Sequence, residues 1–129
     1  MNDKWDVAAE MLGLKDMEFF GGVERCDFTL PQLANLIEIG LVSQEHRFNN
    51  SPTVRSFLEF GKRAEEYGAK VVYEGFLESK ARENARLVVE GVRVTNFIDM
   101  VCVVLDFSQS FHNADEFTAS AELLRAWYD

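Results

Sequence analysis

Apolar side chains recur every three or four positions in three segments of the chain, which is the pattern of amphipathic helices. These segments are residues 3–12, 29–40 and 52–67. Thr29 is a suitable N-cap for the second segment, and Pro31 fits its first turn, where a missing N–H costs nothing. We therefore expect three helices in the first half of the chain.

Apolar and polar residues alternate in the middle of the chain, as they do along strands with one buried face. Residues 70–78 and 85–94 both show this alternation, and the polar segment 79–84 joins them. The pattern predicts a β-hairpin. Residues 23–28 are compatible with one further short strand.

Residues 96–110 are apolar at most positions. The spacing of their few polar residues therefore has to distinguish a helix from a strand. Strict alternation fails here, whereas helical spacing collects the polar side chains on one narrow stripe. That stripe consists of Asp99, Cys102, Asp106 and Ser110. The spacing favours a mostly buried helix, while the strong β character of residues 101–105 keeps a third strand as the alternative.

A final helix is expected to run from a cap at Thr118 or Ser120 to Trp127. Together these elements predict an α+β fold, in which helices pack on a small antiparallel sheet built around the central hairpin 70–78/85–94. The chain has 129 residues, of which 47% are hydrophobic and 11 are Phe. This is enough for one core, so we expect a single domain over residues 1–129.

The chain is acidic, with a net charge of −9, and its acids are concentrated at the two ends. Residues 1–50 hold four Lys/Arg and nine Asp/Glu, residues 51–94 hold eight and seven, and residues 95–129 hold one and six. The ends would repel a phosphate backbone, which argues against nucleic acid as the partner. Residues 30–94 nevertheless share the element order of a winged helix-turn-helix, so nucleic-acid binding stays as a second alternative.

Cys26 and Cys102 are the two cysteines, and neither stands at a metal-ligand spacing, so we expect two buried free thiols. The first residues are acidic and lack the apolar run of a signal peptide. No segment reaches the ~18 apolar residues that a membrane span needs. These features predict a cytoplasmic protein that does not enter a membrane.

Two carboxylates in the hairpin give the sharpest chemical hypothesis. If the strands pair with Phe76 opposite Val88, the same register places Glu74 opposite Glu90. Two carboxylates about 5 Å apart repel each other and need a metal, a cation or a shared proton. The alternative is that a bulge at one of the neighbouring glycines separates them, or that both side chains are solvated.

Further polar residues extend this hypothetical site. Asp99 and Asp106 lie on the predicted buried helix and would need partners there, for which Arg93 and Arg125 are candidates. His112 begins a polar loop that also holds two acids. The candidate ligand or metal residues are Glu74, Glu90, Asp99, Asp106 and His112. Their structural alternative is a set of solvated side chains.

Catalytic and cofactor motifs give no positive signal. The serines lack the nucleophile-elbow pattern, and the glycines form neither a phosphate loop nor a dinucleotide fingerprint. We therefore predict no catalytic residue and no cofactor.

Two pairs of large aromatic residues stand out, because the apolar pattern need not bury both rings of either pair. These are Phe19–Phe20 and Trp127–Tyr128. Aromatic rings are enriched at interface hot spots. The leading hypothesis is a non-enzymatic interaction or regulatory domain, which binds a partner protein or itself through an acidic surface with these anchors. The alternative is a small-molecule or divalent-metal site, with or without catalysis, centred on Glu74 and Glu90.

Overall fold

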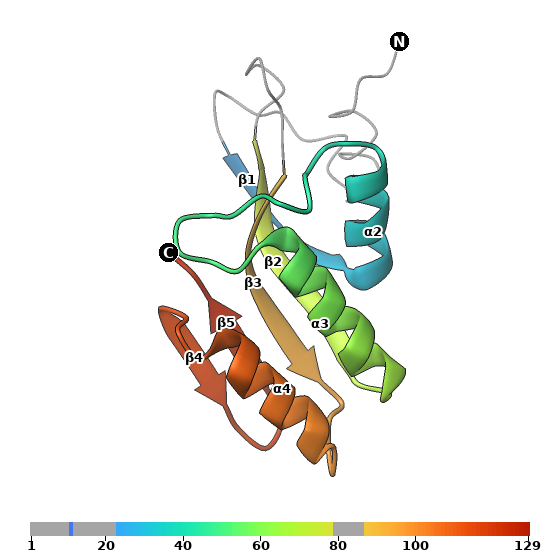
Figure 1. Cartoon of the computed structure of the whole chain (residues 1–129), viewed down its shortest axis with the longest axis vertical. Helices are drawn as coiled ribbons and strands as arrows, with labels where there is room; N and C mark the ends of the chain where they lie inside the picture. Colours follow the sequence, from blue (N-terminus) through green and yellow to red (C-terminus); the bar gives the residue numbers. More distant parts are fainter. Residues whose placement is uncertain (1–10, 12–22, 79–86) are drawn as a thin grey trace.

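The computed structural model describes residue 11, residues 23–78 and residues 87–129. Within these residues, helices pack on one face of a five-stranded antiparallel sheet, which confirms the predicted α+β fold (Figure 1). The strands are β1 (Val23–Thr29), β2 (Lys70–Glu78), β3 (Leu87–Thr95), β4 (Glu116–Ala119) and β5 (Leu124–Trp127). The helices are α2 (Leu30–Glu38), α3 (Val54–Glu66) and α4 (Val101–Phe111). The predicted helix over residues 3–12, Phe19 and Phe20, and the turn 79–84 lie outside the described residues.

The ends of α2 and α3 follow directly from local sequence. Thr29 caps α2: its hydroxyl accepts from the backbone N–H of Gln32, and its own N–H donates to the Gln32 side chain at 2.9 Å. Thr53 caps α3 in the same way, by accepting from the Ser56 N–H at 3.2 Å. Both helices end at a glycine with positive φ, 82° at Gly40 and 99° at Gly68, where other residues would be strained.

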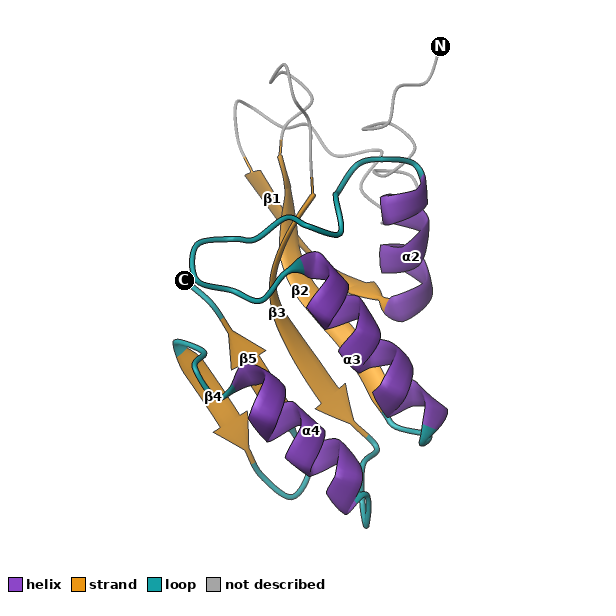
Figure 2. Cartoon of the chain, viewed as in Figure 1, coloured by secondary structure: helices purple, strands orange, loops and turns teal. Residues whose placement is uncertain are grey.

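The strand order in the sheet is β1-β2-β3-β5-β4, and every neighbouring pair is antiparallel. β2 and β3 form the predicted central hairpin. The predicted helix in residues 96–110 is confirmed as α4, which connects β3 to the far edge of the sheet. Figure 2 shows all three helices on the same side of the sheet. Across the described part of the chain, no helix is long and apolar enough to span a bilayer.

The predicted final helix is wrong, because residues 116–127 form the β4–β5 hairpin. Leu124 and Ala126 point into the core while Arg125 and Trp127 point away from it, so this segment alternates at the period of a strand. The free edge of β3 accepts β5 along Gly91–Val94. Long-range pairing of this kind overrides the helix propensity of an Ala-, Glu- and Leu-rich segment.

Aromatic rings fill the space between α3, α4 and the sheet. Phe57 of α3 lies edge-to-face with Tyr73 of β2 at 6.2 Å and stacks on Phe111 of α4 at 5.4 Å. Phe60 contacts Phe107 and Phe111, with ring centroids 6.1 and 5.0 Å apart. This aromatic layer holds the two helices against each other and against β2.

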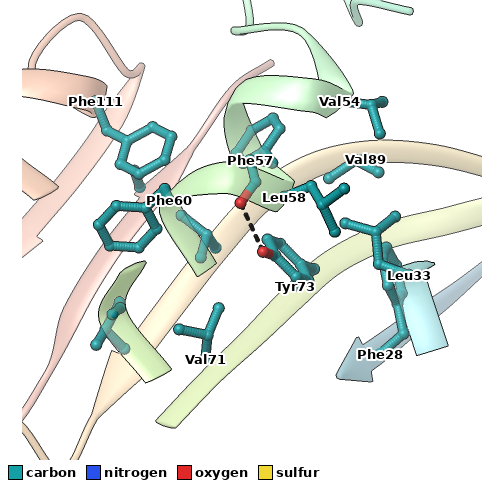
Figure 3. Close-up of a cluster of buried hydrophobic side chains, with 14 of the residues drawn as sticks. Phe28, Leu33, Val54, Phe57, Leu58, Phe60, Val71, Tyr73, Val89 and Phe111 are labelled. Carbon is teal, nitrogen blue, oxygen red and sulfur yellow. Dashed lines mark hydrogen bonds between the residues drawn. The ribbon is translucent and has the colours of Figure 1, made fainter. Parts of the chain in front are cut away.

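The buried Tyr73 hydroxyl lies within that layer and donates to the Phe57 carbonyl oxygen at 2.6 Å (Figure 3). Burial raises the pKa of Tyr73 well above its usual range, so the ring stays neutral. The hydroxyl reaches α3 only because Gly61 has no side chain: a Cβ there would lie 2.1 Å from the hydroxyl oxygen. Gly61 therefore fixes how closely α3 approaches the sheet.

Replacing Gly61 by alanine tests this close approach. In an open helix the change would stabilise the chain by about 1 kcal/mol. Here the new methyl group overlaps the Tyr73 hydroxyl, so we expect Gly61→Ala to lower the free energy of unfolding by about 1–3 kcal/mol. Chemical denaturation measures the change.

The Tyr73→Phe background provides the control, because it removes the oxygen that the new methyl group meets. Gly61→Ala should be less destabilising in that background than in the wild-type chain. If Gly61→Ala were as stable as the wild type, the close approach would not constrain the fold.

Candidate functional site

The sheet face away from the helices carries charged side chains from all five strands. Asp27 of β1 accepts from Arg93 of β3 at 2.7 Å, and Arg93 also lies 3.7 Å from Glu74 of β2. Glu74 accepts two hydrogen bonds from Arg125 of β5, at 2.8 and 2.9 Å. Arg125 in turn lies 3.6 Å from Glu116 of β4. We call these five residues the charge ladder.

The ladder determines what Glu74 can do chemically. Its carboxylate is only 14% exposed and both of its oxygens accept from Arg125. The hydrogen bond to Glu74 raises the pKa of Arg125, which keeps the guanidinium charged. Glu74 is therefore a neutralised member of an ion network rather than a carboxylate open to a ligand.

The predicted register of the hairpin holds on one side of a bulge and is wrong on the other. Phe76 lies opposite Val88 as expected, but Glu74 lies opposite Gly91, and Glu90 is the extra residue between the two registers. The shift occurs at Gly75, where a Cβ would lie 2.1 Å from the Val88 carbonyl oxygen. The two strands approach so closely there that only glycine fits, and the bulge removes the expected pairing of carboxylates.

Glu90 is nevertheless almost fully buried, at 2% exposure, and it forms an ion pair with Arg25 of β1. Arg25 reaches it across the intervening strand β2. The two hairpin carboxylates thus have separate arginine partners, so the repulsion that motivated a metal or a shared proton is absent.

The remaining predicted ligand residues lie on the helical side of the molecule. Asp106 of α4 is held by two hydrogen bonds from Arg63 of α3, at 2.8 and 3.0 Å. His112 is exposed, with Nδ1 3.1 Å from a carbonyl oxygen of its own helix, and Asp99 is exposed in the turn before α4.

The sheet therefore separates Glu74 and Glu90 from Asp99, Asp106 and His112. The predicted partners of the helix acids, Arg93 and Arg125, belong instead to the charge ladder. No three His, Cys, Asp or Glu side chains converge as metal ligands within residues 11, 23–78 and 87–129.

The C-terminal aromatic pair is divided between the two faces of the sheet. Tyr128 is 1% exposed, lies edge-to-face with Phe57 at 6.3 Å, and donates its hydroxyl hydrogen to Asn113 at 2.9 Å. Burial raises the pKa of Tyr128 to about 12. Trp127 is half-buried on the sheet face of the charge ladder, opposite Gly91. Tyr128 thus offers no ring surface to a partner.

An apolar surface that sequence reasoning missed lies on the outer side of α4. The inner side of this helix buries Val103, Phe107 and Phe111. Its outer side is also apolar, which differs from the mostly buried helix that we expected. The exposed residues are Ile98 (74%), Val101 (67%), Cys102, Leu105 (56%) and the neighbouring Tyr67 (61%) at the end of α3. We call these five residues the α4 patch.

The α4 patch continues into a groove between α3 and α4 of about 790 Å³. Its walls include Tyr67, Cys102 and Leu105, and the Arg63–Asp106 ion pair and Glu66 supply its charges. Cys102, predicted to be buried, is an exposed thiol in this groove, and Cys26 is half-buried. The signal was present in the sequence: residues 96–110 carry more apolar side chains than one helix face can bury.

Comparisons of the chain with protein-family models, with curated proteins and with solved structures give no match.

Glu74→Gln tests whether the charge ladder stabilises the fold. The amide keeps the size of the side chain but offers Arg125 one acceptor oxygen in place of two, and it leaves that guanidinium with the longer contact to Glu116 as its ion pair. We expect the free energy of unfolding to fall by about 1.5–3 kcal/mol, measured by urea denaturation in the presence of a chelator.

Asp27→Asn is the matched control. Asp27 lies at the end of the same ladder, with 53% side-chain exposure. Because the Asp27–Arg93 pair is exposed, neutralising Asp27 should lower the free energy of unfolding by less than about 1 kcal/mol. Equal losses for the two variants would contradict a central role for Glu74. A metal-induced rise in Tm that Glu74→Gln abolished would instead favour the carboxylate-site alternative.

Proposed function

We propose that this domain is a non-enzymatic protein-interaction domain, which binds a partner protein through the α4 patch. The observation that carries the proposal is the double-sided apolar character of α4. Its inner phenylalanines complete the core, so the exposed residues Val101 and Leu105 contribute nothing to that core. Burying one such side chain against a partner stabilises a complex by about 1.5–3 kcal/mol.

The shape and composition of the surface support a protein as the occupant. Tyr67 and Leu105 stand on neighbouring helices and form an apolar centre, with the Arg63–Asp106 ion pair beside it. An apolar centre with a polar rim is the usual organisation of a protein interface. An aromatic residue at such a centre is a typical hot spot. The exposed Cys102 thiol supports the cytoplasmic location predicted from the sequence.

Neither alternative has a comparable observation in its favour. A ligand or metal site at Glu74 and Glu90 would have to displace arginine from both carboxylates. A winged-helix reading would need α3 to enter a DNA groove, but α3 lies on the sheet and packs against α4. Its outer side carries three acids, Glu59, Glu65 and Glu66, beside three bases, Arg55, Lys62 and Arg63, so it offers phosphate no net positive charge.

Site-directed photo-crosslinking tests the proposal in the cells that produce the protein. A benzophenone group is attached to Cys102 in a Cys26→Ala background, and adducts are identified by mass. We expect a discrete adduct with a partner protein, and its loss in the variant Val101→Ser/Leu105→Ser. Both replaced side chains are exposed, so the fold itself should lose less than about 1 kcal/mol.

Ala34→Cys in a chain without Cys26 and Cys102 places the same group on the exposed side of α2, away from the patch. This control should not give the adduct. The proposal fails if both positions give the same adduct, or if the adduct survives the double serine variant while the fold remains intact.

A further inference from the structure

We infer that the segment of the partner that occupies the α3–α4 groove is an amphipathic helix with basic flanks. This inference rests on the proposed interaction function and specifies its partner. It follows from the shape of the groove, from the distribution of charge around it and from the net charge of the whole chain.

The two helices that border the groove run antiparallel. Phe57 of α3 stacks on Phe111 near the end of α4, whereas Tyr67, at the end of α3, borders the groove together with Cys102 in the first turn of α4. A groove between two antiparallel helices fits a third helix, whose side chains pack into the row between them.

The length of the apolar stripe matches a short helix. Val101, Leu105 and the groove residue Gln109 follow one another at intervals of four along the outer side of α4, and exposed Ile98 lies in the turn before the helix. The helical part of this row covers about 12 Å, or a little over two turns. A partner helix with apolar residues at positions i, i+3 or i+4 and i+7 would cover this stripe.

The charges around the groove select a basic helix. Among the described residues that line the groove, Arg63 is the single cation, and its guanidinium donates two hydrogen bonds to Asp106. Glu66 lines the groove without an ion pair to a described residue, and exposed Asp99 precedes α4. Lysine or arginine beside the apolar row of the partner would meet these acids.

The same charges argue against a second copy of this chain as the occupant. Each copy carries a net charge of −9, and a symmetric contact would bring Glu66 and Asp99 of both copies into one interface. Like charges placed opposite each other oppose association and select against that pairing. A basic helix is attracted instead of repelled, because the negative electrostatic field of the whole chain acts on it before contact.

Two model peptides of about five helical turns test the inference directly. The basic probe has leucine at i, i+3, i+4 and i+7 with lysine beside them, and the acidic probe replaces each lysine by glutamate. Fluorescence anisotropy with the full chain measures both affinities. We expect the basic probe to bind and the acidic probe to bind at least about tenfold more weakly at low ionic strength.

Charge reversal at the rim locates the binding site. Glu66→Lys should weaken binding of the basic probe about fivefold to tenfold at low ionic strength. The matched control Glu38→Lys makes the same change of net charge on exposed α2, and it should alter the affinity less than about twofold. Leu105→Ser should also weaken binding of the basic probe, because it removes an apolar contact without changing the charge.

The outcomes separate this inference from the proposed function. Equal effects of Glu66→Lys and Glu38→Lys would show attraction to the whole acidic chain and would overturn the inference. So would equal affinity for the two probes. A crosslink from Cys102 to a second copy, lost in the double serine variant, would overturn the basic-helix partner while supporting an interaction surface. Failure of the crosslinking experiment itself would overturn both.

Discussion

The contact between α3 and β2 is the constraint on which the rest of the structure depends. Gly61 lets the helix approach the sheet until the Phe57 carbonyl oxygen accepts from the Tyr73 hydroxyl. That approach fixes the height at which Phe57 and Phe60 stand over the sheet, and α4 completes the layer with Phe107 and Phe111. Once these large rings occupy the inner side of α4, its remaining apolar residues have to face outward.

The two faces of the sheet are stabilised by different kinds of interaction. The helical face excludes water with aromatic and aliphatic groups, whereas the opposite face joins acids and arginines from β1 to β4 in a series of ion pairs. In the ladder each internal charge has a partner, so the face is stabilised without any ligand. The exposed apolar area lies instead on α4, on the opposite side of the sheet from the charge ladder.

Much of the fold was predictable from residues whose effect is local. Thr29 and Pro31 begin α2, glycines with positive φ end α2 and α3, and alternation defines the hairpin. The errors come from interactions between distant segments. Residues 116–127 have a helical composition, but β5 pairs with the edge of β3 and β4 pairs with β5, and no local pattern in this segment predicts that edge.

The candidate site was less predictable than the fold, for a related reason. The bulge at Glu90 arises because Gly75 permits a close approach of β3, and one residue of register decides which carboxylates meet. Arg93 and Arg125 were expected to pair with acids of the helix 96–110, but they pair within the charge ladder. Sequence separation does not tell which face of the sheet a side chain occupies. The α4 patch was visible as an excess of apolar residues, but only the packing of Phe107 and Phe111 shows which side is left exposed.

The acidic character of the chain and the exposed patch make sense together. A surface with Ile98, Val101 and Leu105 exposed would, on a neutral protein, favour association between copies. A net charge of −9 opposes that association over a distance of about one Debye length, so the patch can stay exposed without aggregation. The same field attracts a partner of opposite charge. In the proposed interaction, the net charge disfavours a second copy of the chain, and the apolar residues of the α4 patch supply the contact area for a basic partner.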